Sequence, residues 1–286
     1  MALVVESTAT NTGASVTSLT ITKPAGLVVG DLMVCSLSQF DATADTITTL
    51  SGWTLIQNEA FTNGVVNAQY KIATSGDVAA SNFTWTFSGN TQYISGSIMR
   101  ISGFNTLAPV FFSDAGADNT AATGTFATNF TPTVNGNLFV LVYSANDNAG
   151  TGTYTSFGVT GSSVTFTELY DSTLDAGTSD PILGAAYGTQ TTAANITAFT
   201  GTVSVAKDNM AGIIISIEPR VDVTGTNTLV TTTSEAFTQT GTADTVGTNT
   251  LATTNSEAFA QSGRGTSPTQ WANESKPSTT WTNESI

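Results

Sequence analysis

The stretch GDLMVCSLS, residues 30–38, begins with a Gly-Asp turn pair and continues as an apolar run that is short for a helix. A run of this length fits a β-strand that is covered on both faces. Two other segments, SVTSLTIT at 15–22 and NFTWTFS at 82–88, alternate apolar and polar residues as half-buried strands do. Because turn residues separate such segments and no long stretch has a 3.6-residue apolar period, the sequence predicts an all-β fold.

The opening stretch occurs a second time in the chain. GDLMVCSLS is matched by GNLFVLVYS at 136–144, and the flanking segments follow in the same order, so that Tyr187 takes the position of Tyr70. Similar order in two segments of about 100 residues is the signature of an internal repeat. A shared bias towards Thr and Gly is the alternative explanation of the match.

The duplication predicts the domain organisation. We expect two tandem antiparallel β-sandwich domains, of the jelly-roll or immunoglobulin-like type, at residues 1–104 and 105–220. Short strands separated by Gly, Asn, Asp and Ser clusters favour sandwiches over a parallel α/β sheet. An alternative is that the two halves intertwine into one larger sandwich.

Beyond Arg220 the chain changes to near-identical repeats. GTNTLVTTTSEAFTQTG at 225–241 returns as GTNTLATTNSEAFAQSG at 247–263, 22 residues further on. Each copy has too few apolar residues for a core of its own. Residues 221–263 are therefore expected to pack on one another, on the preceding domains or on another chain.

The last segment, 264–286, repeats a shorter phrase, WANES and then WTNES. Its Pro277 and β-branched Thr residues favour an extended arm. Tryptophan often dominates the energy of a binding interface, and few apolar neighbours are available here to bury it. The arm is therefore predicted to dock on a partner. The residues assigned to this partner-binding segment are Trp271, Asn273, Glu274, Trp281, Asn283, Glu284 and, in the preceding repeats, Phe237 and Phe259.

The residue usage argues against several classes of function. Seven Lys and Arg stand against 21 Asp and Glu, and the net charge of -14 argues against sequence-independent binding of nucleic acid. Histidine, the commonest general base near neutral pH and the commonest metal ligand, is absent. The one cysteine, Cys35, lies in an apolar run and is expected to be buried and inert. Without an 18-residue apolar run or a basic leader, we expect neither a membrane span nor a secretion signal.

The sequence nominates no catalytic centre. It has neither a nucleophile elbow nor a phosphate-binding loop, and its carboxylates fall mostly in polar loops, where they are usually solvated. We expect no enzymatic activity and no cofactor. Calcium is an alternative at the oxygen-rich loops 144–152 and 171–180, although neither has EF-hand spacing. Trp53 and Trp85 are expected in the core rather than on a carbohydrate-binding surface.

The first copy resembles a module of tailed-bacteriophage structural proteins. The resemblance covers residues 18–105 and rests on the segments KPAGLVVGDL, SGWTLIQNE, AQYKIATSGD, NFTWTFSG and ISGSIMRISGF. The second copy departs from the pattern, with Phe166 in place of Trp53 and Ser216 in place of Arg100. The family pattern carries no catalytic residues over to this chain.

The resemblance implies a component of the phage particle and leaves its place open between head decoration, head fibre and tail fibre. We expect the protein on the surface of the particle. We expect a non-enzymatic capsid decoration or cement protein, present in symmetric copies and docked through its C-terminal arm onto other virion proteins and copies of itself. The alternative is a tail-fibre or adhesin-like protein whose sandwich loops bind host glycan. A hydrolase or glycosidase accessory module is a third hypothesis.

Overall fold

The architecture is that of a computed structural model. It describes residues 3–40, 46–62, 64–88, 92–118, 122–147, 152–173, 180–204 and 207–220, and the backbone of the strands between 223 and 285. Ala2–Pro219 form one compact unit and Arg220–Ile286 belong to another, so the two are treated separately. The described residues are mostly β-strand, with one short helix among them, and the all-β prediction is confirmed.

The first half of the larger unit contains one five-stranded sheet and one two-stranded sheet. Its elements are β1 (Val4–Val16), β2 (Ser18–Thr22), β3 (Leu32–Phe40), β4 (Thr54–Phe61), β5 (Gly64–Ile72), α1 (Ser75–Ala79), β6 (Asn82–Thr86) and β7 (Gln92–Ser102). The large sheet has the strand order β1-β7-β3-β5-β4, and β2 pairs with β6 in the small sheet. All of these pairings are antiparallel.

The second half has a matching pair of sheets. Its strands are β8 (Phe112–Asp118), β9 (Thr123–Phe130), β10 (Asn137–Asp147), β11 (Tyr154–Thr160), β12 (Thr167–Thr173), β13 (Asp180–Gln190), β14 (Ile196–Val203) and β15 (Lys207–Ile217). The large sheet has the order β12-β13-β10-β15-β8, and the small one the order β11-β14-β9. Strands β8, β9, β10, β12, β13, β14 and β15 thus correspond to β1, β2, β3, β4, β5, β6 and β7, with β11 as an additional strand.

The register shows that the correspondence extends to single residues. Val34 lies opposite Tyr70 between β3 and β5, and Val140 lies opposite Tyr187 between β10 and β13. The edge strands β4 and β12 each have a register irregularity at the equivalent place. It lies between Leu55 and Gln57 in β4 and between Glu168 and Tyr170 in β12. The sequence match of Tyr187 with Tyr70 is therefore reproduced in the sheets. That each half is a domain of its own stays a prediction.

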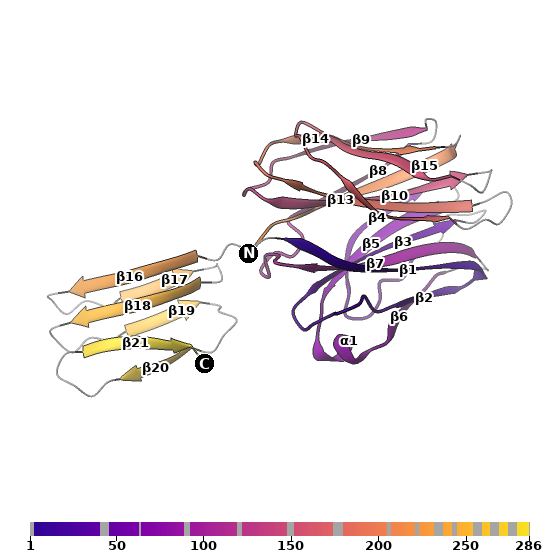
Figure 1. Cartoon of the computed structure of the whole chain (residues 1–286). Helices are drawn as coiled ribbons and strands as arrows, with labels where there is room; N and C mark the ends of the chain where they lie inside the picture. Colours follow the sequence, from indigo (N-terminus) through magenta and orange to yellow (C-terminus); the bar gives the residue numbers. More distant parts are fainter. Residues whose placement is uncertain are drawn as a thin grey trace. The chain divides into compact units, whose positions relative to one another are not determined.

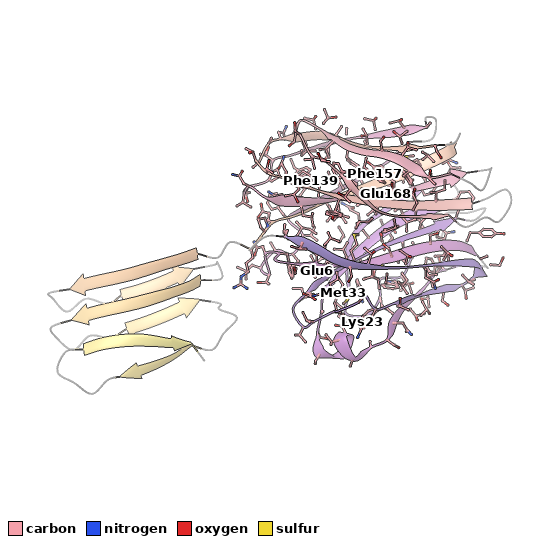
Figure 2. The ribbon with its side chains drawn as sticks, in the orientation of Figure 1. Glu6, Lys23, Met33, Phe139, Phe157 and Glu168 are labelled. Carbon is pink, nitrogen blue, oxygen red and sulfur yellow. The ribbon has the colours of Figure 1, made fainter. Side chains whose placement is uncertain are left out.

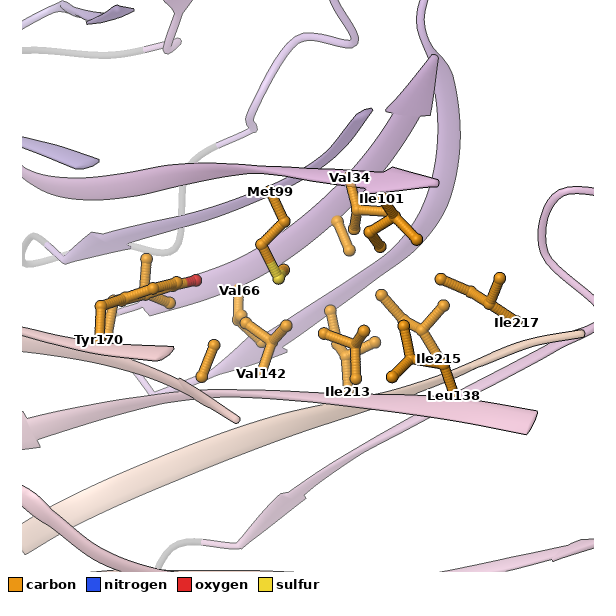
Figure 3. Packing of buried hydrophobic residues seen from close by; sticks show 14 of the residues in the cluster. Val34, Val66, Met99, Ile101, Leu138, Val142, Tyr170, Ile213, Ile215 and Ile217 are labelled. Atoms are coloured by element: carbon orange, nitrogen blue, oxygen red, sulfur yellow. The ribbon is translucent and has the colours of Figure 1, made fainter. Parts of the chain in front are cut away.

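Three clusters of buried apolar residues explain why the central strands are apolar on both faces. One cluster lies between the two large sheets and joins the halves, with Val34 and Ile101 on one side and Leu138 and Ile215 on the other (Figure 3). The other two lie between each large sheet and its own small sheet. Met33 and Phe139, equivalent in register, belong to these outer clusters (Figure 2). The sheets of this unit are therefore stacked in layers (Figure 1).

Two equivalent glycines allow the layers to approach closely. A Cβ on Gly96 in β7 would lie 2.7 Å from Leu37 and 2.8 Å from Leu19. A Cβ on Gly212 in β15 would lie 2.6 Å from the ring of Tyr143, which is equivalent to Leu37. All three distances are shorter than real Cβ contacts, so a side chain at either position would displace the packed neighbours of the outer layer.

The smaller unit consists of strands that stack the 22-residue repeats on each other. Its strands are β16 (Val223–Thr231), β17 (Phe237–Gly241), β18 (Thr245–Thr253), β19 (Phe259–Gly263), β20 (Thr269–Asn273) and β21 (Thr279–Ser285). β16 pairs with β18, and β17 with β19, in parallel and with identical repeat positions side by side. β21 pairs antiparallel with both β18 and β20 (Figure 1).

Candidate functional site

The predicted partner-binding residues lie in the stacked repeats. Phe237 and Phe259 are direct neighbours across the β17–β19 pair. Leu229, Leu251 and Trp281 form one row across β16, β18 and β21. The repeats are therefore in register with each other, as solenoid repeats are, and each supplies the pairing surface for its neighbour.

The C-terminal segment forms an antiparallel pair instead of one extended strand. Trp271 lies opposite Asn283, and Asn273 lies opposite Trp281, between β20 and β21. The two tryptophans thus occupy diagonal positions in adjacent strands, although ten residues separate them in sequence. The pairing satisfies backbone groups that a single extended strand would leave to a partner.

Some of the predicted site lies outside the described part of the molecule. Glu274 falls in the segment 274–278, which is outside the described residues. Glu284 lies in β21 opposite Gln270. The docking role of the whole set stays a prediction.

In the larger unit, an ion pair between Asp31 and Arg100 holds the turn that precedes β3. The Asp31 carboxylate accepts a hydrogen bond from the Val28 amide at 2.9 Å and one from the Arg100 guanidinium at 2.5 Å. Both side chains are largely buried. In the second half Asn137 takes the place of Asp31, and its amide donates to the Val134 carbonyl. Asp31 and Arg100 are therefore engaged in holding the turn before β3.

Tyr154 and Asp171 form a second polar contact, which joins β11 of the small sheet to β12 of the large sheet in the second half. The Tyr154 amide donates to the Asp171 carboxylate at 2.9 Å. Burial, and next the negative charge of Glu168, raise the pKa of Asp171 to about 6. Within the described residues, the other Asp171 oxygen and the Tyr154 hydroxyl make no hydrogen bond to protein. This contact could not be recognised from the sequence, because Asp171 stands in a loop-like stretch of polar residues.

Hydroxyl groups connect the two halves inside the central interface. Ser36 lies in hydrogen-bond contact with Tyr170 of the second half and with Ser97 of its own sheet, the latter at 2.8 Å. Ser38 and Ser144 contact each other in the same way. These serines interrupt otherwise apolar strands, and their pairing explains how they are accommodated without exposure to water.

The core predictions for the aromatic residues and the cysteine are confirmed. Trp53 and Trp85 are buried and in edge-to-face contact, with ring centroids 5.3 Å apart. The indole of Trp85 donates to the Gln69 amide oxygen at 3.1 Å. Cys35 is buried, and burial raises the pKa of its thiol. These side chains are core residues.

The structure describes the two loops considered for calcium binding only in part. Residues 148–151 and 174–179 of the two oxygen-rich loops lie outside the described residues. Within the described ranges, no group of three or more His, Cys, Asp or Glu side chains is arranged to hold a metal ion. No helix of the described part of the chain is long and apolar enough to cross a membrane.

Comparison with known proteins gives no relative on which to base an assignment. No protein-family model matches the chain, and searches of curated proteins and of solved structures gave no significant match. A functional assignment therefore rests on the residues and their geometry.

Proposed function

We propose that the protein is a non-enzymatic structural component of a tailed-phage particle, a decoration protein that docks on the capsid surface through residues 221–286. Each half of the larger unit is a jelly-roll-like sandwich in this proposal, and the two together form the rigid body that covers the shell. The partners are other virion proteins and further copies of the same chain.

The observation that carries the proposal is the in-register stacking of the C-terminal repeats. Asn227 lies beside Asn249, and Leu229 beside Leu251, so this sequence pairs with a copy of itself. A segment of this kind provides backbone pairing and a repeated surface without a large core. Trp271 and Trp281, at the far end of the stack in sequence, supply the anchors that bind the partner.

The resemblance of residues 18–105 to phage structural proteins supports the same assignment. The residues behind that resemblance, Asp31, Trp53 and Arg100, are engaged in turn formation and packing in the larger unit. Since these three residues maintain the fold of the larger unit, partner binding is assigned to other parts of the chain. This favours a scaffold that is carried to its position by its C-terminal segment.

The test compares two double variants for their binding to particles that lack the protein. Trp271→Ala/Trp281→Ala is expected to weaken the affinity for the particles at least a hundredfold, and so to lower occupancy at limiting protein concentration, because each truncated tryptophan anchor costs about 2 kcal/mol. Thr280→Ala/Thr282→Ala, which changes the residues on either side of Trp281, is the matched control and should bind normally. Occupancy is measured by quantitative mass spectrometry and by cryo-electron microscopy of the particles.

Equal occupancy of both double variants would refute docking through the tryptophans. Loss of host adsorption with unchanged occupancy of the heads would favour the tail-fibre alternative. In that case, binding of residues 1–220 to a glycan array should identify the host sugar.

A further inference from the structure

The contacts between the two large sheets are reciprocal. β4 contacts β8, and its equivalent β12 contacts β1, the equivalent of β8. Three further contacts also recur when each strand is replaced by its equivalent. The contact β4–β15 recurs as β12–β7, the contact β7–β13 as β15–β5, and the contact β3–β13 as β10–β5. Strand β3 contacts its own equivalent, β10. An interface in which each contact recurs with the partners exchanged has the two-fold symmetry of an isologous homodimer.

The residues in the interface follow the same symmetry. Ser38 and Ser144 are equivalent in register and contact each other, which places them at the local two-fold axis. Around them the central cluster is built largely from equivalent pairs. These pairs are Leu32 with Leu138, Val34 with Val140, Val66 with Leu183, Ala68 with Ala185, Met99 with Ile215, and Ile101 with Ile217.

We infer that the inward face of the first half is a self-complementary docking surface, whose alternative partner is the first half of a second copy of this chain. The face already packs against a second half that has the same sheet and the same register. A copy of the first half presents the equivalent strands in the equivalent order. Two chains can therefore be joined by the geometry that joins the two halves of one chain.

Positions at which the two halves differ determine whether two first halves or two second halves pair more readily. We call either of these a homotypic pair. Ser36 contacts Tyr170, whereas the equivalents of these residues are Val142 and Gln57. Pairing of two first halves would place Ser36 opposite Gln57, and both can form hydrogen bonds. Pairing of two second halves would place the buried Tyr170 hydroxyl opposite Val142 on both sides and leave it without a partner. The first half should therefore pair with itself more readily than the second.

Refolding from denaturant allows the choice to be measured in the full-length chain. Each first half can join the second half of its own chain, at an effective concentration on the order of millimolar, or the first half of another chain. Cys35→Ala/Ser38→Cys leaves one thiol per chain, at the local axis, so that homotypic pairs of first halves can be trapped by a disulfide. Cys35→Ala/Ser144→Cys is the matched control for pairs of second halves.

The refolding is carried out at rising chain concentration under mild oxidation, and crosslinked dimer is measured on non-reducing gels. We expect the Ser38→Cys dimer to increase with concentration and to exceed the Ser144→Cys dimer at least tenfold. The triple variant Cys35→Ala/Ser38→Cys/Ser144→Cys should form the disulfide within one chain, which verifies both folding and the position of the axis. Equal amounts of the two dimers, or a folded triple variant without the internal disulfide, would overturn the inference.

Discussion

Ser38 and Ser144, one from each half of the chain, share a hydrogen-bond contact inside the central interface, where both are fully buried. The two residues occupy equivalent positions in β3 and β10. The contact therefore joins a position to its own duplicate.

Removal of one of these hydroxyls should lower the stability of the protein by more than half of the loss caused by removing both. Ser38→Ala leaves the Ser144 hydroxyl buried without its partner, and we expect the free energy of unfolding to fall by about 1–2 kcal/mol. Ser38→Ala/Ser144→Ala removes both groups and should cost less than the two single changes combined. Urea denaturation of the four proteins of this cycle measures the difference, and additive losses would show that the contact contributes nothing.

The Asp31–Arg100 ion pair gives a second test, because the second half lacks it. Arg100→Met leaves the Asp31 carboxylate buried with the Val28 amide as its remaining partner, and should lower stability by about 3 kcal/mol. Asp31→Asn in the same chain introduces the amide that Asn137 already has in the second half. This double variant should recover much of the loss, as measured by thermal and urea unfolding. A double variant no more stable than Arg100→Met would contradict the argument.

A side chain at either of the two equivalent glycines should destabilise the packing of the outer layers. Gly96→Ala and Gly212→Ala each introduce a Cβ within 3 Å of packed side chains, and we expect each to lower stability by about 1–3 kcal/mol. Gly76→Ala in α1 is the control, since its nearest neighbour there, the Thr74 hydroxyl, would be 3.6 Å away. That variant should be neutral or slightly more stable because alanine favours helix. Calorimetric melting temperatures of the three variants distinguish a packing effect from a general sensitivity to alanine.

The raised pKa of Asp171 predicts a dependence of stability on pH. Its pKa is about 6 in the folded chain, above the value of about 3.9 in an unfolded chain, so the folded state holds the proton more tightly. The resulting stabilisation is complete below about pH 4 and is lost as the pH rises through 6. Because Asp171 is only partly buried, we expect a change of about 1 kcal/mol. Asp171→Asn should remove this part of the dependence in urea denaturation curves taken from pH 4 to pH 7.

The duplicated sheets were predictable because the repeat preserves the residues that set register. Gly136 and Leu138 stand in the second copy where Gly30 and Leu32 stand in the first, and the match extends to the two tyrosines that face Val34 and Val140. What the sequence could not give is the partner of the inward faces. An apolar residue in β3 indicates burial on that side, but the same pattern suits a separate sandwich core or a core shared with the other half.

The candidate site was predictable only as a repeat. The 22-residue spacing indicates that Phe237 and Phe259 are equivalent, and parallel stacking then makes them neighbours. The antiparallel pairing of Trp271 with Asn283 depends on long-range contacts of a segment in which local preferences favour any extended conformation. The polar contact of Asp171 was missed for a related reason: its pairing with the Tyr154 amide of another strand leaves no sign in the residues next to either of them.

The stacking of the C-terminal repeats has a consequence for how length can change. Since Gly225 lies beside Gly247 and Leu229 beside Leu251, one copy of 22 residues advances the stack by a single strand spacing, about 4.8 Å. Duplicating or deleting a whole copy in the gene would lengthen or shorten the stack by that step and leave every remaining ladder intact. The length of the stack is therefore set by the number of 22-residue copies. Recombination between copies can change that length without altering the residues at either end of the segment.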